Sequence, residues 1–348
     1  MEENSIVQEQ NNGEETKEIE DKPKPIKIEE PIKKLEPKPK KPLNIKESIR
    51  NFYDKQYKKL MIIPLIMLLL AIISISYQVA TTGDFIQRDV TLKGGVTITI
   101  PSEKPVDIAG LQSQLSSRFK ENDISARTLK RAGTDVGIII TADIDAENKE
   151  NIDLFLSAIA EKLSIKLEEG SYSIEVMGSS LGADFFKNSL NALLFSFLFM
   201  AIVVFAVFRV PIPSLAVILA AFSDIVVTVA VVNLLGIKLG TAGIAAFLML
   251  IGYSVDTDIL LTTRVLKRKE GTEFERILSS VSTGMTMTLT AITAVAVAII
   301  FTQNDTIRQI MTILLIGLLA DIINTWIQNV GILRLYLERK SKQTKKWP

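Results

Sequence analysis

Six long apolar runs constrain the fold of this 348-residue chain more than any other feature of its sequence. They cover about residues 60–80, 190–208, 214–235, 241–261, 277–301 and 310–333. A helix needs ~20 mostly apolar residues to cross a bilayer, and each run is close to that length. Because backbone polar groups in lipid must bond within their own segment, such runs predict helices. We therefore expect a polytopic α-helical membrane protein with six transmembrane helices, of which the first (TM1) is residues 60–80 and the others (TM2–TM6) lie within 190–333.

Lys and Arg residues cluster at alternate ends of these runs, which predicts the orientation of the chain. The clusters precede the first run, separate the second from the third and the fourth from the fifth, and follow the sixth: Lys55, Lys58, Lys59, Arg209, Arg264, Lys267, Arg268, Lys269, Arg276, Arg334, Arg339, Lys340, Lys342, Lys345 and Lys346. The opposite loops hold little beyond Lys238 and Arg308. Cytoplasmic loops carry the excess of basic residues, so we expect both termini in the cytoplasm and the protein in the cytoplasmic membrane of the cell.

The two ends of the chain are polar. Residues 1–43 alternate Glu and Lys and contain six prolines, which predicts a disordered, charged cytoplasmic tail. Residues 44–59 carry apolar side chains at helical spacing among Lys and Arg, as in an amphipathic helix at the membrane interface. Residues 334–348 are expected to form a basic cytoplasmic tail.

The insert at residues 83–184 is expected outside the cytoplasm. The spacing of its apolar residues changes repeatedly between that of a strand and that of a helix. Strand-like alternation covers 90–100, 124–131, 136–142 and 172–176, and helical spacing covers 107–121 and 147–163. The order β-α-β-β-α-β is that of a ferredoxin-like α+β domain. Many unrelated proteins share this fold, so the fold by itself identifies no function.

The residues that are missing limit the chemistry. The chain has no Cys and no His, which excludes disulfides and metal sites built on thiolate or imidazole ligands. It also lacks a nucleophile motif, a phosphate-binding loop and a cluster of metal ligands. We therefore expect no enzyme activity, no cofactor, no metal and no nucleic-acid partner. The formal net charge of +1 indicates neither an acidic nor a basic partner.

Four carboxylates fall inside the predicted spans and are the candidate functional residues: Asp224, Asp256, Asp258 and Asp321. A charge at the centre of a bilayer costs about 2.5–3.5 kcal/mol on insertion scales, so such residues persist in a bundle interior, a hydrated path or a partner interface. No Lys or Arg lies deep in any predicted span. A buried aspartate would then be protonated, held by hydroxyls and amides, or paired with a cation from another subunit.

Two polar helix faces accompany these carboxylates. One passes through Asp321 and contains Gly317, Asn324 and Gln328; the other lies on the fifth span and contains Ser279, Thr283, Thr286, Thr290 and Thr293. For the first face, hydrogen-bonded packing and a proton or ion relay remain equal alternatives. For the second, helix packing is favoured over the lining of a hydrated path.

Asp256 and Asp258 are two residues apart, so on one helix they point to nearly opposite sides. Asp256 shares its side with Gly252 and Tyr253 and is expected to work through its charge or proton. Asp258 is expected to tolerate substitution better. Small residues on this span, including Gly252, predict close contact between helices.

Several short segments resemble the SecF family of protein-export proteins. Residues 250–258, Leu-Ile-Gly-Tyr-Ser-Val-Asp-Thr-Asp, followed by Arg264, resemble the family's fourth-span signature. Gly178-Ser-Ser-Leu-Gly182 and Lys93-Gly94-Gly95 are similar to glycine motifs flanking the family's insert, and the resemblance covers about residues 60–340. It implies a member of the RND superfamily that pairs with a SecD subunit and assists the SecYE translocon in moving a polypeptide across the membrane.

The chain differs from bacterial SecF proteins at two points. Those proteins usually read Asn-Asp-Thr where this chain reads Asp256-Thr257-Asp258, and they carry an Arg early in span five, near Ser282 or Thr283 here. The archaeal form is the closer match. Two alternatives remain: a subunit of an RND-type small-molecule or lipid exporter, which the single small insert disfavours, and a scaffold for the translocon that transports nothing.

Overall fold

A computed structural model describes residues 55–102, 106–131, 134–145, 147–168, 170–268, 270–302 and 304–346. Within these residues, six helical segments are long and apolar enough to cross a membrane, in agreement with the six predicted spans. The predicted tail at residues 1–43 and most of the predicted interfacial helix at 44–59 lie outside the described residues.

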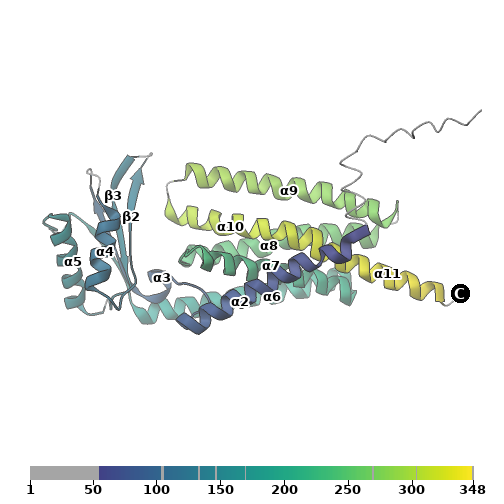
Figure 1. The fold of residues 1–348 in the computed structure, drawn as a ribbon, viewed down its shortest axis with the longest axis horizontal. Helices are drawn as coiled ribbons and strands as arrows, with labels where there is room; N and C mark the ends of the chain where they lie inside the picture. The colour runs from purple at the N-terminus through teal and green to yellow at the C-terminus, as the bar shows by residue number, and fades with distance from the viewer. Residues whose placement is uncertain are drawn as a thin grey trace, which may run out of the picture. The chain divides into compact units, whose positions relative to one another are not determined.

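The membrane helices follow the predicted order (Figure 1). They are α2 (Ile62–Thr82), preceded by helical residues 55–60, and then α6 (Ser179–Phe208), α7 (Pro211–Leu234), α8 (Thr241–Lys267), α9 (Glu273–Phe301), α10 (Asp305–Ile323), the π-helix η1 (Asn324–Asn329) and α11 (Val330–Lys346). Pro211 occupies the first turn of α7, and Thr272 forms a capping box with Glu275 at the start of α9.

Two predicted boundaries differ from the structure. α6 begins at Ser179, so the predicted end of the insert at 184 falls within a membrane helix. The last span continues through η1 into α11, so the predicted basic tail at 334–348 is helical as far as Lys346. In both places the helix extends into polar sequence. Spans predicted from apolar runs end before such residues, so these helix ends were not predicted.

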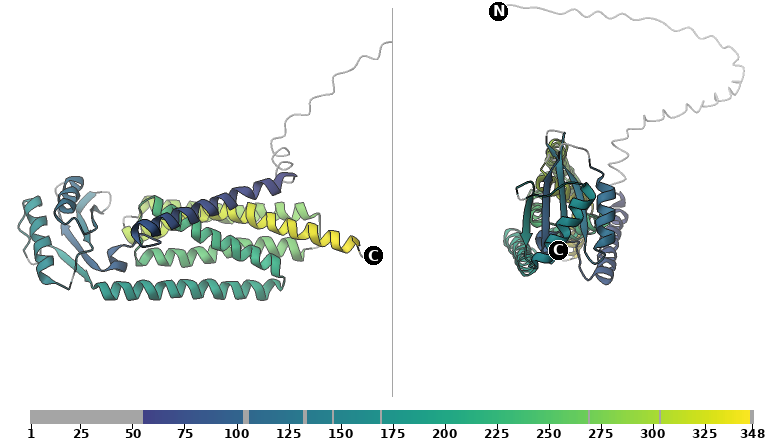
Figure 2. Two further views of the ribbon diagram at one scale, coloured as in Figure 1. Left: turned by 60° about the horizontal axis from the view of Figure 1, so that its bottom comes forward. Right: turned by 90° about the vertical axis from the view of Figure 1, so that its left-hand side faces the viewer.

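The helices differ greatly in how much of their apolar surface the chain itself covers. In the most apolar window, 61% of residues are buried in α7 and 56% in α8, against 11% in α2, 6% in α6 and 17% in α9. Figure 2 shows α6 running along the outside of the bundle. α7, α8 and α10 therefore form the interior, while α2, α6 and α9 expose Leu, Ile and Phe side chains as lipid-facing helices do.

The insert is built on a four-stranded antiparallel sheet. Its strands are β1 (Gly95–Pro101), β2 (Ile124–Arg131), β3 (Thr134–Ala142) and β4 (Ser173–Met177), in the spatial order β2-β3-β1-β4. Helices α4 (Ile108–Arg118) and α5 (Lys149–Leu163) bury Leu111 and Phe155 against Ile98 and Ile140 of the sheet. The alternating burial of β1 follows the two-residue period of its sequence, and β3 contributes Ile138, Ile140 and Ala142 to the core of the insert.

The first predicted strand, 90–100, is only partly correct. Residues Val90–Lys93 form the short helix α3, because the Asp89 side chain accepts a hydrogen bond from Val90 N at 2.7 Å and caps the turn. Gly94 ends this turn at a φ of 92°, and a Cβ there would lie 2.4 Å from the Cα of Ser179. A Cβ on Gly182 would lie 2.8 Å from Gly94 N. The two glycine motifs thus allow the insert and α6 to pack backbone against backbone.

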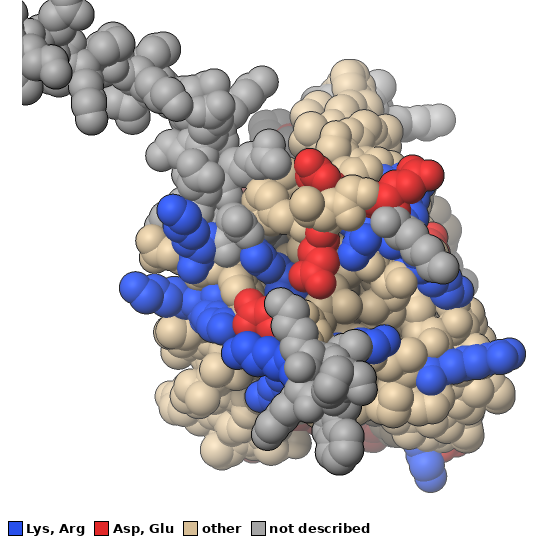
Figure 3. Space-filling model, turned by 90° about the vertical axis from the view of Figure 1, so that its right-hand side faces the viewer, with Lys and Arg blue, Asp and Glu red and all other residues tan. Residues whose placement is uncertain are grey.

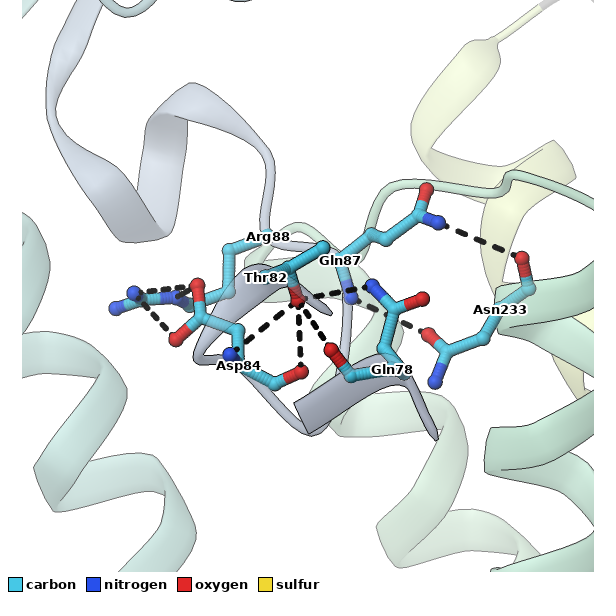
Figure 4. Close-up of polar contacts among 6 residues, drawn as sticks. All are labelled: Gln78, Thr82, Asp84, Gln87, Arg88 and Asn233. Carbon is cyan, nitrogen blue, oxygen red and sulfur yellow. Dashed lines mark hydrogen bonds and ion pairs between the residues drawn. The ribbon is translucent and has the colours of Figure 1, made fainter. Parts of the chain in front are cut away.

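Hydrogen bonds join residues 87–89, which follow α2, to the loop between α7 and α8. Asp89 N donates to Leu239 O at 2.8 Å, and Leu239 N donates to Gln87 O at 2.7 Å. Asn233 accepts from Gln87 N at 3.2 Å through its side chain (Figure 4). Lys238 on the same loop pairs with Asp123 of the insert at 2.6 Å. The insert is therefore attached to the end of α7 and to the loop between α7 and α8.

Candidate intramembrane polar site

Buried polar side chains gather where α7, α8, α10 and η1 meet in the bundle interior. Those with at most 7% exposure are Ser223, Asp224, Thr228, Ser254, Thr257, Asp258, Asp321, Asn324, Thr325, Gln328 and Asn329. Three of the four predicted aspartates belong to this cluster, together with Asn324 and Gln328 of the predicted polar face. Burying a polar group in a low-dielectric interior costs free energy unless the group is hydrogen-bonded. The side chains of this cluster are therefore expected to form one hydrogen-bonded network.

Asp224 of α7 connects three helices. Its Oδ2 accepts a hydrogen bond from Ser254 Oγ of α8 at 2.5 Å, and its Oδ1 accepts one from Asn324 Nδ2 of η1 at 2.7 Å. Both carboxyl oxygens are thus bonded, and the residue has no exposed surface.

Asp321 of α10 lies beside Asp224. Its Oδ1 accepts from Thr325 Oγ1 at 2.9 Å and its Oδ2 accepts from Thr257 Oγ1 at 3.3 Å. Thr257 lies three residues after Ser254 on α8, and Asn324 lies three residues after Asp321, so the partners of the two carboxyls come from the same stretches of chain. Two adjoining carboxyls of this kind can hold and pass a proton.

Asp258 of α8 forms the third centre of the network. Its Oδ1 accepts from Asn329 Nδ2 of η1 at 2.7 Å. Within the described residues, the donors that reach these carboxyls from the protein are hydroxyls and side-chain amides. Of the options open from the sequence, the structure therefore shows carboxyls held by neutral partners.

The π-helix η1 explains how one helix presents so many polar groups. Its residues Asn324, Thr325, Gln328 and Asn329 are all buried, as two adjacent pairs four positions apart. A regular α-helix turns neighbouring residues about 100° apart, whereas the wider turn of a π-helix broadens the inward face, and such bulges are frequent at functional sites. Gln328 Nε2 reaches Ser223 Oγ at 3.3 Å, and Gly317 lies against Leu250.

Asp256 lies on the opposite side of α8, exposed at the surface of the bundle. Gly252 and Tyr253 share this exposed face, and Tyr253 is 44% exposed. The predicted divergence of Asp256 and Asp258 is confirmed. No described residue makes the close helix contact predicted at Gly252, where a Cβ would meet nothing within 4 Å. The sequence could not say which side was inward, because both sides of the segment carry an aspartate.

The hydroxyl stripe of α9 lies mostly outside the network. Thr286 and Thr290 are exposed and donate to the carbonyl oxygens four residues earlier, at 2.8 and 2.7 Å. The packing predicted for them is therefore absent from the described contacts of this chain. Thr283 instead accepts from Arg264 Nη1 of α8 at 2.8 Å. A guanidinium of α8 thus reaches Thr283 on the fifth span.

Several members of the network were missed from the sequence: Ser223, Ser254, Thr257, Thr325 and Asn329. Ser and Thr are common in membrane helices, so their presence alone is a weak signal. A usable signal did exist at Asn324-Thr325 and Gln328-Asn329, where polar pairs repeat every four residues in an apolar run.

Comparison with known proteins identifies the family. Residues 159–339, which include the whole polar site, match the family model described as protein export membrane protein SecD/SecF, C-terminal. The protein-export membrane protein SecF of Pyrococcus furiosus is 37% identical over 300 residues, covering 85% of this chain and 96% of that protein. The chain belongs to the SecF family. The SecF of Methanocaldococcus jannaschii is 39% identical over 289 residues, covering 81% of this chain and 96% of the relative.

A solved structure shares the SecF fold described here. The crystal structure of SecDF, a translocon-associated membrane protein from Thermus thermophilus, superimposes with a TM-score of 0.62 at 18% identity. The match covers 82% of this chain but only 38% of that one, so this SecF family member spans less than half of the SecDF chain. The likeness supports the arrangement of helices and sheet, and the identity to archaeal SecF proteins supports the archaeal type.

Proposed function

We propose that this SecF family member is an accessory subunit of the Sec protein-export machinery that acts with a SecD-like subunit. The observation that carries this proposal is the 37% identity to an archaeal SecF across 96% of that protein's length. The SecDF structure supports the pairing, because there a match to this chain occupies only part of a longer one. We also propose, on the basis of the same family membership, that it assists a SecYE translocon and a translocating polypeptide.

We further propose the topology predicted from the basic residues. Figure 3 shows Lys and Arg side chains around the end of the bundle where α11 emerges, and Arg264 and Lys267 lie in the last turn of α8. Under the positive-inside rule this end faces the cytoplasm. The insert between α2 and α6 then lies outside, and we propose that it is a ferredoxin-like domain, which its β-α-β-β-α-β order and antiparallel β2-β3-β1-β4 sheet support.

The buried network is proposed to couple proton movement to export. Asp224 and Asp321 are buried in one network of hydroxyl and amide partners, and intramembrane carboxyls of this kind are the usual components of proton relays. The alternative is that the network only packs α7, α8 and η1 together in a scaffold. Its well-formed hydrogen bonds favour neither role over the other, so substitution must decide.

The exposed face of Asp256, Gly252 and Tyr253 is proposed to meet the SecD-like subunit. A carboxylate facing lipid is costly, whereas a protein interface can supply donors or a cation. Gly252 leaves room there for close approach of another helix. Asp256 is thus proposed to act in assembly. The proton chemistry predicted for Asp256 is proposed instead for the buried residues Asp224 and Asp321.

Secretion of a reporter protein in cells tests the relay against the scaffold. At matched membrane abundance, Asp224→Asn and Asp321→Asn keep size and most hydrogen bonding but remove the ionisable group. Impaired export with normal copurification of SecD supports the relay. Wild-type export by both variants would leave the scaffold as the better account. If this protein copurified with another transporter subunit, and without SecD or translocon subunits, the result would instead favour the small-molecule exporter.

A further inference from the structure

An apolar groove lies on the outer side of the bundle, where α2 runs beside α7 and α11. Its volume is about 510 Å³. Its walls include Leu65 of α2, Leu219 of α7 and Ile332 of α11, and Lys58 lines it as well. Leu65 is 62% exposed and Leu219 is 41% exposed, so the groove is open to the surrounding membrane.

The groove lies between two contacts of α2 with the rest of the bundle. At one of them Met61 packs on Gly331 of α11, where an added Cβ would collide with the Met61 side chain. At the other, Ala71 belongs to a buried cluster with Val227 of α7. Between these contacts the exposed side chain of Leu65 is covered by neither neighbouring helix. The groove is therefore a gap in the packing of α2.

The length of the groove matches one leaflet of a bilayer. Its residues on α2 extend from Lys58 to Leu68, and at 1.5 Å per residue they span about 15 Å. The hydrocarbon core of a bilayer is ~30 Å thick, so each leaflet contributes about half of this length. With Lys58 at the level of the headgroups, Leu68 lies near the middle of the membrane. The groove therefore has the length of one acyl chain.

Basic side chains gather at the headgroup end of the groove, which is the end of the bundle seen in Figure 3. The Lys58 side chain is 60% exposed, and Lys55, three residues earlier, continues the same face of the helix. The Arg334 guanidinium of α11 lies 4.3 Å from the centre of the Tyr57 ring. Glu338 accepts hydrogen bonds from Tyr57 and Lys58. These three cations outnumber this carboxylate, so the groove begins in positive charge where a phospholipid carries its phosphate.

We propose that the groove binds one anionic phospholipid, with an acyl chain along α2 and α7 and the phosphate at Lys58. An acyl chain alone would not distinguish one lipid from another. The basic end does, because each Lys near a membrane surface raises the affinity for anionic lipid about fivefold. The bound lipid fills the gap between α2 and its neighbours. The site does not depend on the proposed role in export, since it concerns only how the bundle contacts the bilayer.

Native mass spectrometry of the purified full-length protein in detergent tests the proposal. The protein is titrated with phosphatidylglycerol and, in parallel, with phosphatidylcholine, which has the same acyl chains but no net charge. One phosphatidylglycerol is expected to bind at least about fivefold more tightly than phosphatidylcholine. Equal affinities for the two lipids would overturn the proposal, because the groove would then be an apolar surface without selectivity.

Charge variants locate the phosphate. Lys58→Gln is expected to weaken phosphatidylglycerol binding about fivefold. Glu338→Gln is expected to strengthen it, because a carboxylate that competes for Lys58 is removed. Lys267→Gln changes an exposed lysine in the last turn of α8, serves as the matched control and should bind as the wild type does. If neither Lys58→Gln nor Glu338→Gln changed the affinity, the ion pair would be purely structural and the proposal would be wrong.

Variants that fill the groove locate the acyl chain. Leu65→Trp places a large ring in the groove and is expected to abolish binding of phosphatidylglycerol. Ile66→Trp adds the same ring to the next residue of α2, which is 51% exposed and does not line the groove, so it should keep the lipid. Copurification of SecD is measured for both variants. If Leu65→Trp lost SecD but kept the lipid, the groove would hold a partner helix and the proposal would be overturned.

Discussion

Asp224 illustrates why a buried aspartate can be required for folding as well as for transport. It accepts one hydrogen bond from Ser254 and one from Asn324, each on a different helix. Asp224→Leu would leave both donors unpaired, which costs about 1–3 kcal/mol for each buried group. We expect a clear fall in Tm for Asp224→Leu and a much smaller one for Asp224→Asn, measured by thermal unfolding in detergent.

The matched control for this prediction is Asp256→Leu. Asp256 is exposed on the other side of α8, so its loss should leave the Tm of the isolated chain almost unchanged. If Asp256→Leu lowered the Tm as much as Asp224→Leu, burial would not explain the effect.

Glycine positions test packing inside the bundle in the same way. A Cβ on Gly284 of α9 would lie 2.2 Å from the ring of Trp326, whereas a Cβ on Gly252 would meet nothing within 4 Å. Overpacking a tight contact typically costs about 1–3 kcal/mol. Gly284→Ala is expected to lower the free energy of unfolding by about this amount, and Gly252→Ala is expected to leave it unchanged. Both are measured by denaturation of the protein solubilised in detergent. Equal effects would show that α9 does not pack on Trp326 as described.

At the scale of elements, the apolar runs were sufficient to predict six membrane helices, and the alternating periods were sufficient for the four strands. Both patterns extend over many residues, so a local irregularity does not hide them. α3 was missed because Val90-Thr91-Leu92-Lys93 has strand-like alternation, whereas in the structure Asp89 caps its start and Gly94 caps its end. The π-helix was missed because its identity depends on backbone geometry, which composition does not report.

The candidate site was only partly predictable for a related reason. A charged residue in an apolar run is visible in any sequence, so Asp224, Asp258 and Asp321 were found. Which hydroxyl or amide faces each carboxyl depends on the rotation of neighbouring helices. That rotation is set by tertiary packing, such as Gly317 against Leu250, and no single segment encodes it.

The insert is expected to fold as an element of its own. Its core of Ile98, Leu111, Ile140 and Phe155 is contributed by the sheet and by α4 and α5, without membrane helices. Residues 95–177, expressed alone, should give a mixed α/β circular dichroism spectrum and a cooperative melt. A random-coil spectrum would show that the contacts with α6 and with Lys238 are needed for folding.

For the whole molecule, the basic residues predict a topology that fusions can test. A reporter after residue 269 or at the C-terminus should report the cytoplasm, and one inserted between β2 and β3 should report the outside. The physical reason is the excess of Lys and Arg at one end of the helices. An outside signal at residue 269 would contradict the proposed orientation of α8 and α9.

Assembly with a SecD-like subunit is the property of the whole molecule that depends most on its surface. The exposed face of α8 combines an aspartate with a glycine that leaves open space, which suits the close approach of a partner helix. Gly252→Leu should therefore reduce copurification of SecD severalfold in pull-downs from detergent, while the Tm of the isolated chain stays the same. Leu69→Phe, on the exposed face of α2, serves as the control for added bulk at a lipid-facing surface and should leave copurification intact. If Gly252→Leu retained SecD as well as the wild type did, the partner would have to bind elsewhere. Another contact would then be needed to offset the free energy of exposing the Asp256 carboxylate to lipid.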